Sequence, residues 1–142
     1  MNYLKFLFTI IAIISILGCK SKSNQMINHL REGRWITIDT LDVIYTIKGR
    51  YKKGIEIGAW RHFSNDRIVR KEKYSKNGIC KIIFYHPNGK IMKKGNTKME
   101  NTTNETHWYY FGKWRFYNTK GGLDSVSVYK KENFTDSLKV KN

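Results

Sequence analysis

The sequence is poor in acidic residues, cysteine and proline. It has 11 Asp and Glu against 27 Lys and Arg, for a formal net charge of +16. The acids are dispersed, so no carboxylate pair indicates glycosidase chemistry, and the histidines lack metal-ligand spacing. No glycine-rich phosphate loop or serine-centred elbow is present. The one proline, Pro87, falls in a turn segment. We therefore predict a protein that is not an enzyme and needs no cofactor or metal.

The N-terminus has the pattern of a secretory signal. Residues 6–17 are almost wholly apolar, Lys5 makes the start weakly basic, and Gly18 precedes Cys19. These features are typical of a signal peptide. The apolar run is too short to cross a bilayer, which takes about 20 apolar residues. We expect residues 1–18 to be removed.

The sequence Ile-Leu-Gly-Cys at residues 16–19 resembles the lipobox of bacterial lipoproteins. The resemblance implies that Cys19 carries lipid and anchors the chain to a membrane; two or more acyl chains give stable anchoring. The alternatives are an ordinary signal peptide with a chance cysteine and an uncleaved anchor. An acidic residue directly after the lipidated cysteine resembles an inner-membrane retention signal. This position holds Lys20, which favours the outer membrane. Once Cys19 is lipidated, Cys80 is the only free thiol, so no intrachain disulfide can form.

The expected mature chain is one small domain with polar ends. Residues 19–28 predict a flexible tether, and residues 25–32 also allow a short helical turn. Residues 135–142 predict a polar tail that frays. Residues 29–134 then form the folded domain.

The excess of basic residues predicts an anionic partner. Such charge usually indicates nucleic acid, but export separates the chain from DNA and most RNA, so we predict no nucleic-acid partner. Lipid head groups attract basic segments by about 1 kcal/mol per Lys or Arg, and peptidoglycan, polysaccharide or an acidic protein would serve equally. The alternative is a solvated face that keeps a small sheet soluble.

The rest of the chain has the character of short strands. Period-two alternation puts one set of side chains on the core face and the other in water. Turn signals rich in Asn and Gly separate the alternating runs and suit tight hairpins. The runs are residues 43–47, 79–85, 113–116 and 125–128. We predict an all-β antiparallel meander of repeated β-hairpins, in which the polar residues 99–107 form an exposed loop at a hairpin tip.

A Gly-x-Trp motif recurs at residues 33–35, 58–60 and 112–114. Glycine lets the strand bend and leaves room beside a large ring. A weaker fourth copy carries Ile82 in place of tryptophan. An aromatic residue near the strand end is expected to close each layer of stacked hairpins. The predicted repeat core is Trp35, Gly58, Trp60, Phe63, Ile82, Tyr85, Gly112, Trp114 and Tyr117.

Residues 51–63 (Tyr-Lys-Lys-Gly-Ile-Glu-Ile-Gly-Ala-Trp-Arg-His-Phe) resemble the MORN-repeat variant of YwqK-type, antitoxin-like proteins. Residues 88–96 match the second half of that pattern. The resemblance implies an elongated, curved antiparallel sheet that works by binding, in an antitoxin or immunity-like role. Cys80 and Ile82 depart from the pattern by replacing its Gly and Trp.

Two groups of side chains are candidate sites. Cys80 alternates with Ile82 and Phe84, so a buried, inert core thiol is a stronger reading than a nucleophile. Aromatic residues interleaved with basic ones can form a binding patch, for which the alternative is a sheet that covers both faces. The proposed patch is Trp108, Tyr110, Lys113 and Arg115.

The sequence as a whole predicts a non-enzymatic lipoprotein of the cell envelope. We expect it to bind a protein partner, in the antitoxin or immunity-like role that the resemblance implies. The alternative is a structural envelope module whose basic face binds an anionic surface. A third, weaker hypothesis is an enzyme that uses Cys80 or a histidine.

Overall fold

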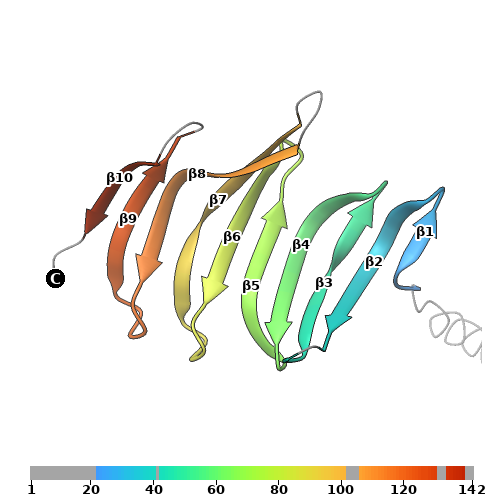
Figure 1. Ribbon diagram of the computed structural model, residues 1–142, viewed down its shortest axis with the longest axis horizontal. Helices are drawn as coiled ribbons and strands as arrows, with labels where there is room; N and C mark the ends of the chain where they lie inside the picture. Colours follow the sequence, from blue (N-terminus) through green and yellow to red (C-terminus); the bar gives the residue numbers. More distant parts are fainter. Residues whose placement is uncertain (1–21, 41, 102–105, 131–133, 140–142) are drawn as a thin grey trace, which may run out of the picture.

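The computed structural model describes residues 22–40, 42–101, 106–130 and 134–139. The strands in these ranges are β1 (Gln25–Ile27), β2 (Leu30–Asp39), β3 (Tyr45–Lys52), β4 (Ile55–Ser64), β5 (Arg67–Tyr74), β6 (Ile79–Tyr85), β7 (Ile91–Asn101), β8 (Thr106–Tyr117), β9 (Leu123–Tyr129) and β10 (Phe134–Lys139). They form one sheet in sequence order, each strand antiparallel to the next (Figure 1). The predicted all-β meander of hairpins is confirmed. The signal peptide and Cys19 lie outside the described residues.

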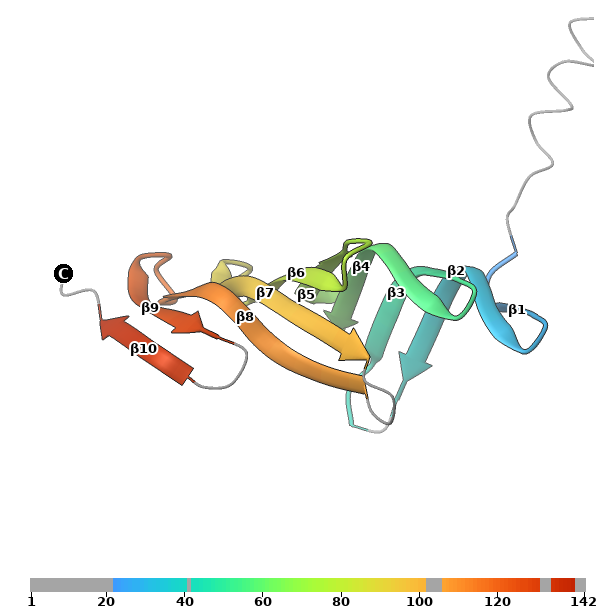
Figure 2. The same cartoon turned by 90° about the horizontal axis from the view of Figure 1, so that it is seen from above.

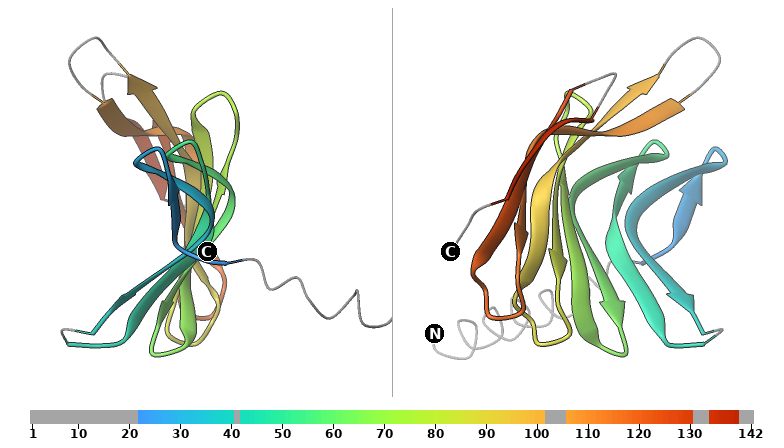
Figure 3. Two further views of the ribbon diagram at one scale, coloured as in Figure 1. Left: turned by 90° about the vertical axis from the view of Figure 1, so that its right-hand side faces the viewer. Right: turned by 60° about the vertical axis from the view of Figure 1, so that its left-hand side comes forward.

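The sheet is a single twisted layer. Figure 2 shows the strands side by side from β1 to β10, and the described residues form no second layer against either face. In Figure 3 the distal part of the β7–β8 hairpin leans out from its neighbours. The described ranges hold no helix long and apolar enough to cross a membrane. A single layer buries little, and the buried apolar side chains are Tyr51, Trp60, Cys80, Ile82 and Trp114.

Strand alternation divides the side chains between two faces. The face that we call the Trp face carries Trp35, Tyr51, Trp60, Tyr74, Cys80, Ile82, Trp108, Tyr110, Trp114 and Tyr129. The opposite face, which we call the basic face, carries Arg34, Lys48, Arg50, Arg61, Lys71, Lys73, Lys81, Lys94, Lys113 and Arg115. The core therefore lies on one side of the sheet and most of the charge on the other.

In the second and third copies of the Gly-x-Trp motif, the glycine forms a bulge in its strand. Gly58 and Gly112 have φ values of 64° and 67°, in the left-handed region that glycine tolerates. At the first of these bulges, the register skips from Lys48 opposite Arg61 to Arg50 opposite Ile57. The bulge seats the tryptophan on a glycine of the preceding strand. A Cβ on Gly49 would lie 2.0 Å from the Trp60 ring.

Two segments that were predicted to lie outside the domain belong to the sheet. β1 occupies part of the predicted tether, residues 19–28, and its extended backbone excludes the helical turn. The Asn24 amide secures it by donating to the Ile36 carbonyl at 2.8 Å and accepting from the Ile36 N–H at 2.7 Å. β10 lies largely in the predicted tail, residues 135–142. Polarity was misleading because an edge strand of a single-layer sheet needs no buried face.

The predicted loop over residues 99–107 is mostly an extension of the β7–β8 hairpin. β7 continues to Asn101 and β8 begins at Thr106. Polar contacts take the place of apolar alternation here. Glu100 Oε1 accepts hydrogen bonds from Lys98 Nζ at 2.7 Å and from the Tyr109 hydroxyl at 2.9 Å. The loop prediction was therefore wrong for residues 99–101 and 106–107, and residues 102–105 lie outside the described residues.

Candidate functional site

A row of directly neighbouring side chains crosses the basic face from β3 to β8. The register places in this row, in order, Lys48, Arg61, Lys71, Ile83, Lys94 and Arg115. Adjacent strands lie about 4.8 Å apart, so the row is about 24 Å long. We call its five cations the basic row. They come from five strands, which brings together charges that are far apart in the sequence.

Further like charges lie opposite one another beside the basic row. Lys73 pairs with Lys81, and Arg34 pairs with Arg50. Directly opposite like charges destabilise a sheet. In the described part of the chain, no ion pair involves the basic row, because Glu72 pairs with His62 and Arg70 and Glu100 with Lys98. The positive potential of this face is therefore available to an external anion.

The lysines of the basic row lie over the aromatic residues of the repeat. Lys48 Nζ is 5.2 Å from the Phe63 ring centroid, Lys71 Nζ is 5.3 Å from that of Tyr85, and Lys94 Nζ is 5.2 Å from that of Tyr117. Such contacts contribute about 0.5–1 kcal/mol at exposed sites. The packed rings orient the three ammonium groups before any ligand arrives.

These contacts correct the predicted place of Phe63, Tyr85 and Tyr117. The three were expected to close the tryptophan layer, but each lies under a lysine on the opposite face. The physical reason is alternation, since each of them follows its anchor (Trp60, Ile82 or Trp114) by an odd number of residues. The repeat thus supplies both faces, with its tryptophan on one and its terminal ring on the other.

On the Trp face, aromatic rings form a continuous series of edge contacts. Centroid distances are 5.6 Å from Trp35 to Tyr51, 4.9 Å from Tyr51 to Trp60, 6.5 Å from Trp60 to Tyr74 and 6.1 Å from Tyr74 to Trp108. Each such pair contributes about 0.5–1.5 kcal/mol beyond its buried area. The series stabilises a sheet against which the described part of the chain packs no second layer.

The proposed patch of Trp108, Tyr110, Lys113 and Arg115 is not brought together. Trp108 and Tyr110 lie on the Trp face, where Tyr110 stacks on Trp114 at 4.3 Å. Lys113 and Arg115 pair with Val128 and Val126 on the basic face. Residues an odd number apart on one strand point to opposite faces, so the interleaved pattern separates these side chains.

The cation that does lie among the aromatic rings of the Trp face is Lys93, which was not predicted from the sequence. Lys93 Nζ is 4.6 Å from the Phe84 centroid, 5.8 Å from that of Tyr110 and 5.9 Å from that of Trp114. Lys93 comes from β7, the strand next to β8. Only the strand pairing reveals this contact, because no spacing along the sequence links Lys93 to Tyr110.

Cys80 is 1% exposed. Burial, with the nearby Glu72 charge, raises the pKa of the Cys80 thiol to about 11. A thiol that is protonated near neutral pH is a poor nucleophile. His62, the buried histidine of the Trp face, forms hydrogen bonds to other groups. Its Nε2 is 2.9 Å from Glu72 Oε2, and its Nδ1 is 3.2 Å from the Tyr45 hydroxyl. The described residues contain no group of three or more side chains that could hold a metal ion.

Comparison with known proteins places no further constraint on the site. The chain matches no protein-family model, no curated protein and no solved structure. The resemblance to the MORN-repeat variant therefore remains a prediction from the sequence, and the geometry of the two faces is the basis for a functional hypothesis.

Proposed function

We propose that the protein is a non-enzymatic, lipid-anchored module of the bacterial cell envelope that binds an anionic surface through its basic face. The observation that carries the proposal is the basic row, in which five cations from five strands share one face without an internal counter-charge among the described residues. Such a row has a cost in stability. An external anion that neutralises the row removes that cost.

The place of the lipid anchor suits this function. Ser23 already bridges to Arg34 beside the sheet, and it lies only four positions after Cys19 in the sequence. Four extended residues reach about 14 Å. Lipid on Cys19 would therefore hold the sheet close to the head groups or to the polymer above them. Tethering at that distance raises the effective concentration of the basic face at the surface.

The expected affinity follows from the number of cations. Each Lys or Arg near an anionic membrane contributes about 1 kcal/mol, so the basic row contributes about 5 kcal/mol. Surface charges are screened over a Debye length of about 8 Å at physiological ionic strength. Binding by the face alone is then weak and strongly salt-dependent, and the lipid anchor makes it persistent.

Sedimentation with vesicles that contain an anionic phospholipid tests the proposal. The double variant Lys71→Gln with Lys73→Gln removes two charges from the basic face, and we expect about 30-fold weaker binding from a loss of about 2 kcal/mol. The matched control removes two exposed turn lysines, Lys53→Gln with Lys120→Gln. An equal loss in both double variants, or none in either, would contradict a role for the face.

A second candidate function is protein binding on the Trp face, as in the antitoxin or immunity-like role that the sequence suggests. It is favoured by a groove of about 640 Å³ whose lining includes Tyr74, Met99 and Trp108 from the Trp face, with Ile55 and Ile57 from the other side of β4. Ile55 is 61% exposed and Trp108 45% exposed. A stoichiometric protein partner that is lost on Trp108→Ser and kept in the Lys71→Gln, Lys73→Gln variant would favour this candidate.

A further inference from the structure

The three copies of the Gly-x-Trp motif differ at their middle residue. This residue is Arg34 in the first copy, Ala59 in the second and Lys113 in the third. All three lie on the basic face, where Ala59 is opposite Lys73. Two copies thus place a long cationic side chain at a position where the middle copy has a single methyl group.

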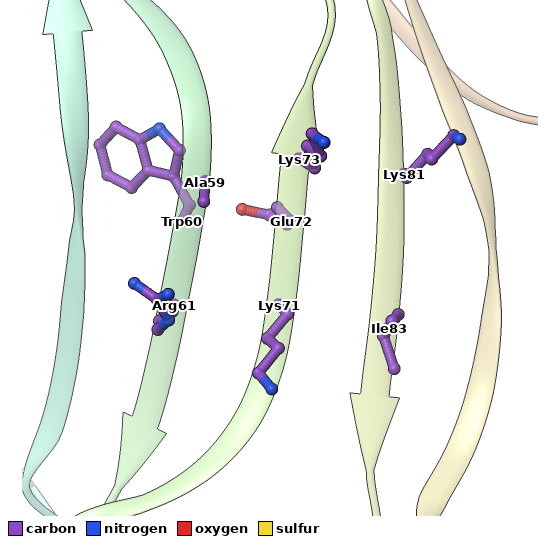
Figure 4. A pocket seen from close by; sticks show the side chains of 8 residues that line it. All are labelled: Ala59, Trp60, Arg61, Lys71, Glu72, Lys73, Lys81 and Ile83. Carbon is purple, nitrogen blue, oxygen red and sulfur yellow. The ribbon is translucent and has the colours of Figure 1, made fainter.

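The alanine leaves a hollow in the middle of the basic face. Its volume is about 270 Å³. Four cationic residues line it, together with Ala59 and Ile83 (Figure 4). Trp60 and Glu72 also belong to the lining, but they alternate with these residues along β4 and β5, so their side chains lie on the Trp face. The cationic residues are Arg61, Lys71, Lys73 and Lys81. The backbone pairing of the strands places Arg61 opposite Lys71 and Lys73 opposite Lys81. The hollow therefore spans β4, β5 and β6.

The charge of the hollow indicates its ligand. A carboxylate carries one negative charge, whereas a phosphate monoester carries about 1.5 to 2 at pH 7. Phosphate accepts both the point charge of lysine and the planar fork of arginine. Four basic residues border one small space, and one of them, Lys71, also contacts the Tyr85 ring outside it. This excess of positive charge favours the phosphate monoester.

The size and floor of the hollow indicate what carries the phosphate. A volume of about 270 Å³ lies just below the usual range for small-molecule sites, about 300–1,000 Å³. The Ala59 methyl and the Ile83 side chain give it an apolar surface. That surface suits the C–H face of a sugar ring and is too short for an acyl chain.

We propose that the hollow over Ala59 is a subsite for the phosphate monoester of a sugar phosphate, such as a phosphorylated sugar of an envelope polymer. The inference rests on the proposed function and narrows it, because it makes one point of the basic face selective. The other two motif copies lack such a subsite, since Arg34 and Lys113 occupy the equivalent position.

Isothermal titration of the full chain with glucose 1-phosphate tests the subsite, with glucose and inorganic phosphate as comparison ligands. Ala59→Leu fills the hollow without changing the charge, and Ala59→Lys fills it while adding a positive charge. We expect each variant to weaken glucose 1-phosphate binding at least tenfold. A general electrostatic field would instead make Ala59→Lys bind as well as the wild type or better. The matched control, Lys113→Ala, removes one charge outside the hollow and should change binding less than twofold.

Several results would overturn the subsite. These are no binding of glucose 1-phosphate by the wild type, unchanged binding in Ala59→Leu, unchanged or stronger binding in Ala59→Lys, and inorganic phosphate or unphosphorylated glucose binding as tightly as glucose 1-phosphate. Ala59 is exposed, so both variants should fold, which far-UV circular dichroism checks.

Vesicle sedimentation of the same variants separates the two proposals. Ala59→Leu keeps the whole basic row, so it should still bind anionic vesicles like the wild type. If it does and yet loses glucose 1-phosphate, both proposals are supported. Normal vesicle binding with unchanged glucose 1-phosphate binding overturns only the subsite. A wild-type protein that binds glucose 1-phosphate but no vesicles overturns only the surface proposal.

Discussion

Replacing Gly49 with alanine should destabilise the sheet severely, although alanine is ordinarily the better strand residue. Glycine within a strand costs about 0.5–1 kcal/mol relative to alanine. Gly49 is an exception because the Trp60 ring lies directly on its backbone. A Cβ there would be 2.0 Å from Cδ2 of Trp60 and 2.2 Å from Cε2. Either the ring or the β3 backbone must move by more than 1 Å.

The magnitude follows from how firmly the ring is held. Trp60 is 4% exposed and makes an edge contact with Tyr51 at a centroid distance of 4.9 Å. Forcing extra atoms into a packed site costs about 1–3 kcal/mol and occasionally more. With so close an approach to a fixed ring, we expect Gly49→Ala to cost about 3 kcal/mol. The m-value of a small domain is about 1–3 kcal/mol/M, so the urea midpoint should fall by about 1–3 M.

A double-mutant cycle tests the cause of this loss. Trp60→Leu alone also destabilises, because the packing of the ring is lost. In the Trp60→Leu background the clash is gone, so adding Gly49→Ala should cost less than about 0.5 kcal/mol or even stabilise. Urea unfolding followed by far-UV circular dichroism measures all four proteins. Additive losses would refute the reasoning.

Gly58→Ala provides the matched control for backbone strain. Its φ is 64°, and no atom lies within 4 Å of the Cβ position. The cost should therefore be only the left-handed penalty of about 1–2 kcal/mol. The cost of Gly58→Ala should be nearly the same in the wild type and in the Trp60→Leu background.

Three more outcomes are expected. Glu72→Ala should lower the unfolding free energy by about 2–4 kcal/mol in urea titration, because it leaves His62 and Arg70 without their buried carboxylate partner; an unchanged midpoint would exclude the network as a stabilising element. Burial raises the pKa of the Cys80 thiol from 9.0 to about 11, so the folded state holds that proton more tightly than the unfolded state does. The resulting contribution to the free energy of unfolding is complete below pH 9 and is lost as the pH rises to 11. Cys80→Ala should therefore show a flatter fall in urea midpoint over this range, and a fall as steep as that of the wild type would contradict the assignment. Cys19→Ala should abolish both fatty-acid labelling and membrane fractionation of the expressed protein; retained labelling would place the lipid elsewhere.

The hairpin architecture was predictable because it depends on local signals. Alternation over residues 79–85 and the Asn-Gly turn before them determine one strand and its connection. The motif glycines also indicated a bend, which the φ values of Gly58 and Gly112 explain. The ends of the sheet were not predictable in this way. β1 and β10 are edge strands held by backbone pairing, which polar sequences satisfy as well as apolar ones.

The candidate site depends on register, and register is not local. The basic row exists because the bulge at Gly58 leaves Arg61 opposite Lys48, and the bulge at Gly112 leaves Arg115 opposite Lys94. No local pattern in the sequence predicts which residues are paired across these strands. One signal was available and unused: comparison of the three Gly-x-Trp copies singles out Ala59 as the small residue at a basic position.

Lysine footprinting tests the role of the basic face most directly. The full chain is treated with an acetylating reagent, with and without anionic vesicles, and modification at each lysine is quantified by mass spectrometry. The proposed orientation predicts that Lys71, Lys73 and Lys81 are protected by the vesicles, while the turn lysines Lys53 and Lys120 react as before. Uniform protection of all five, or protection of the turn lysines alone, would contradict binding through the basic face.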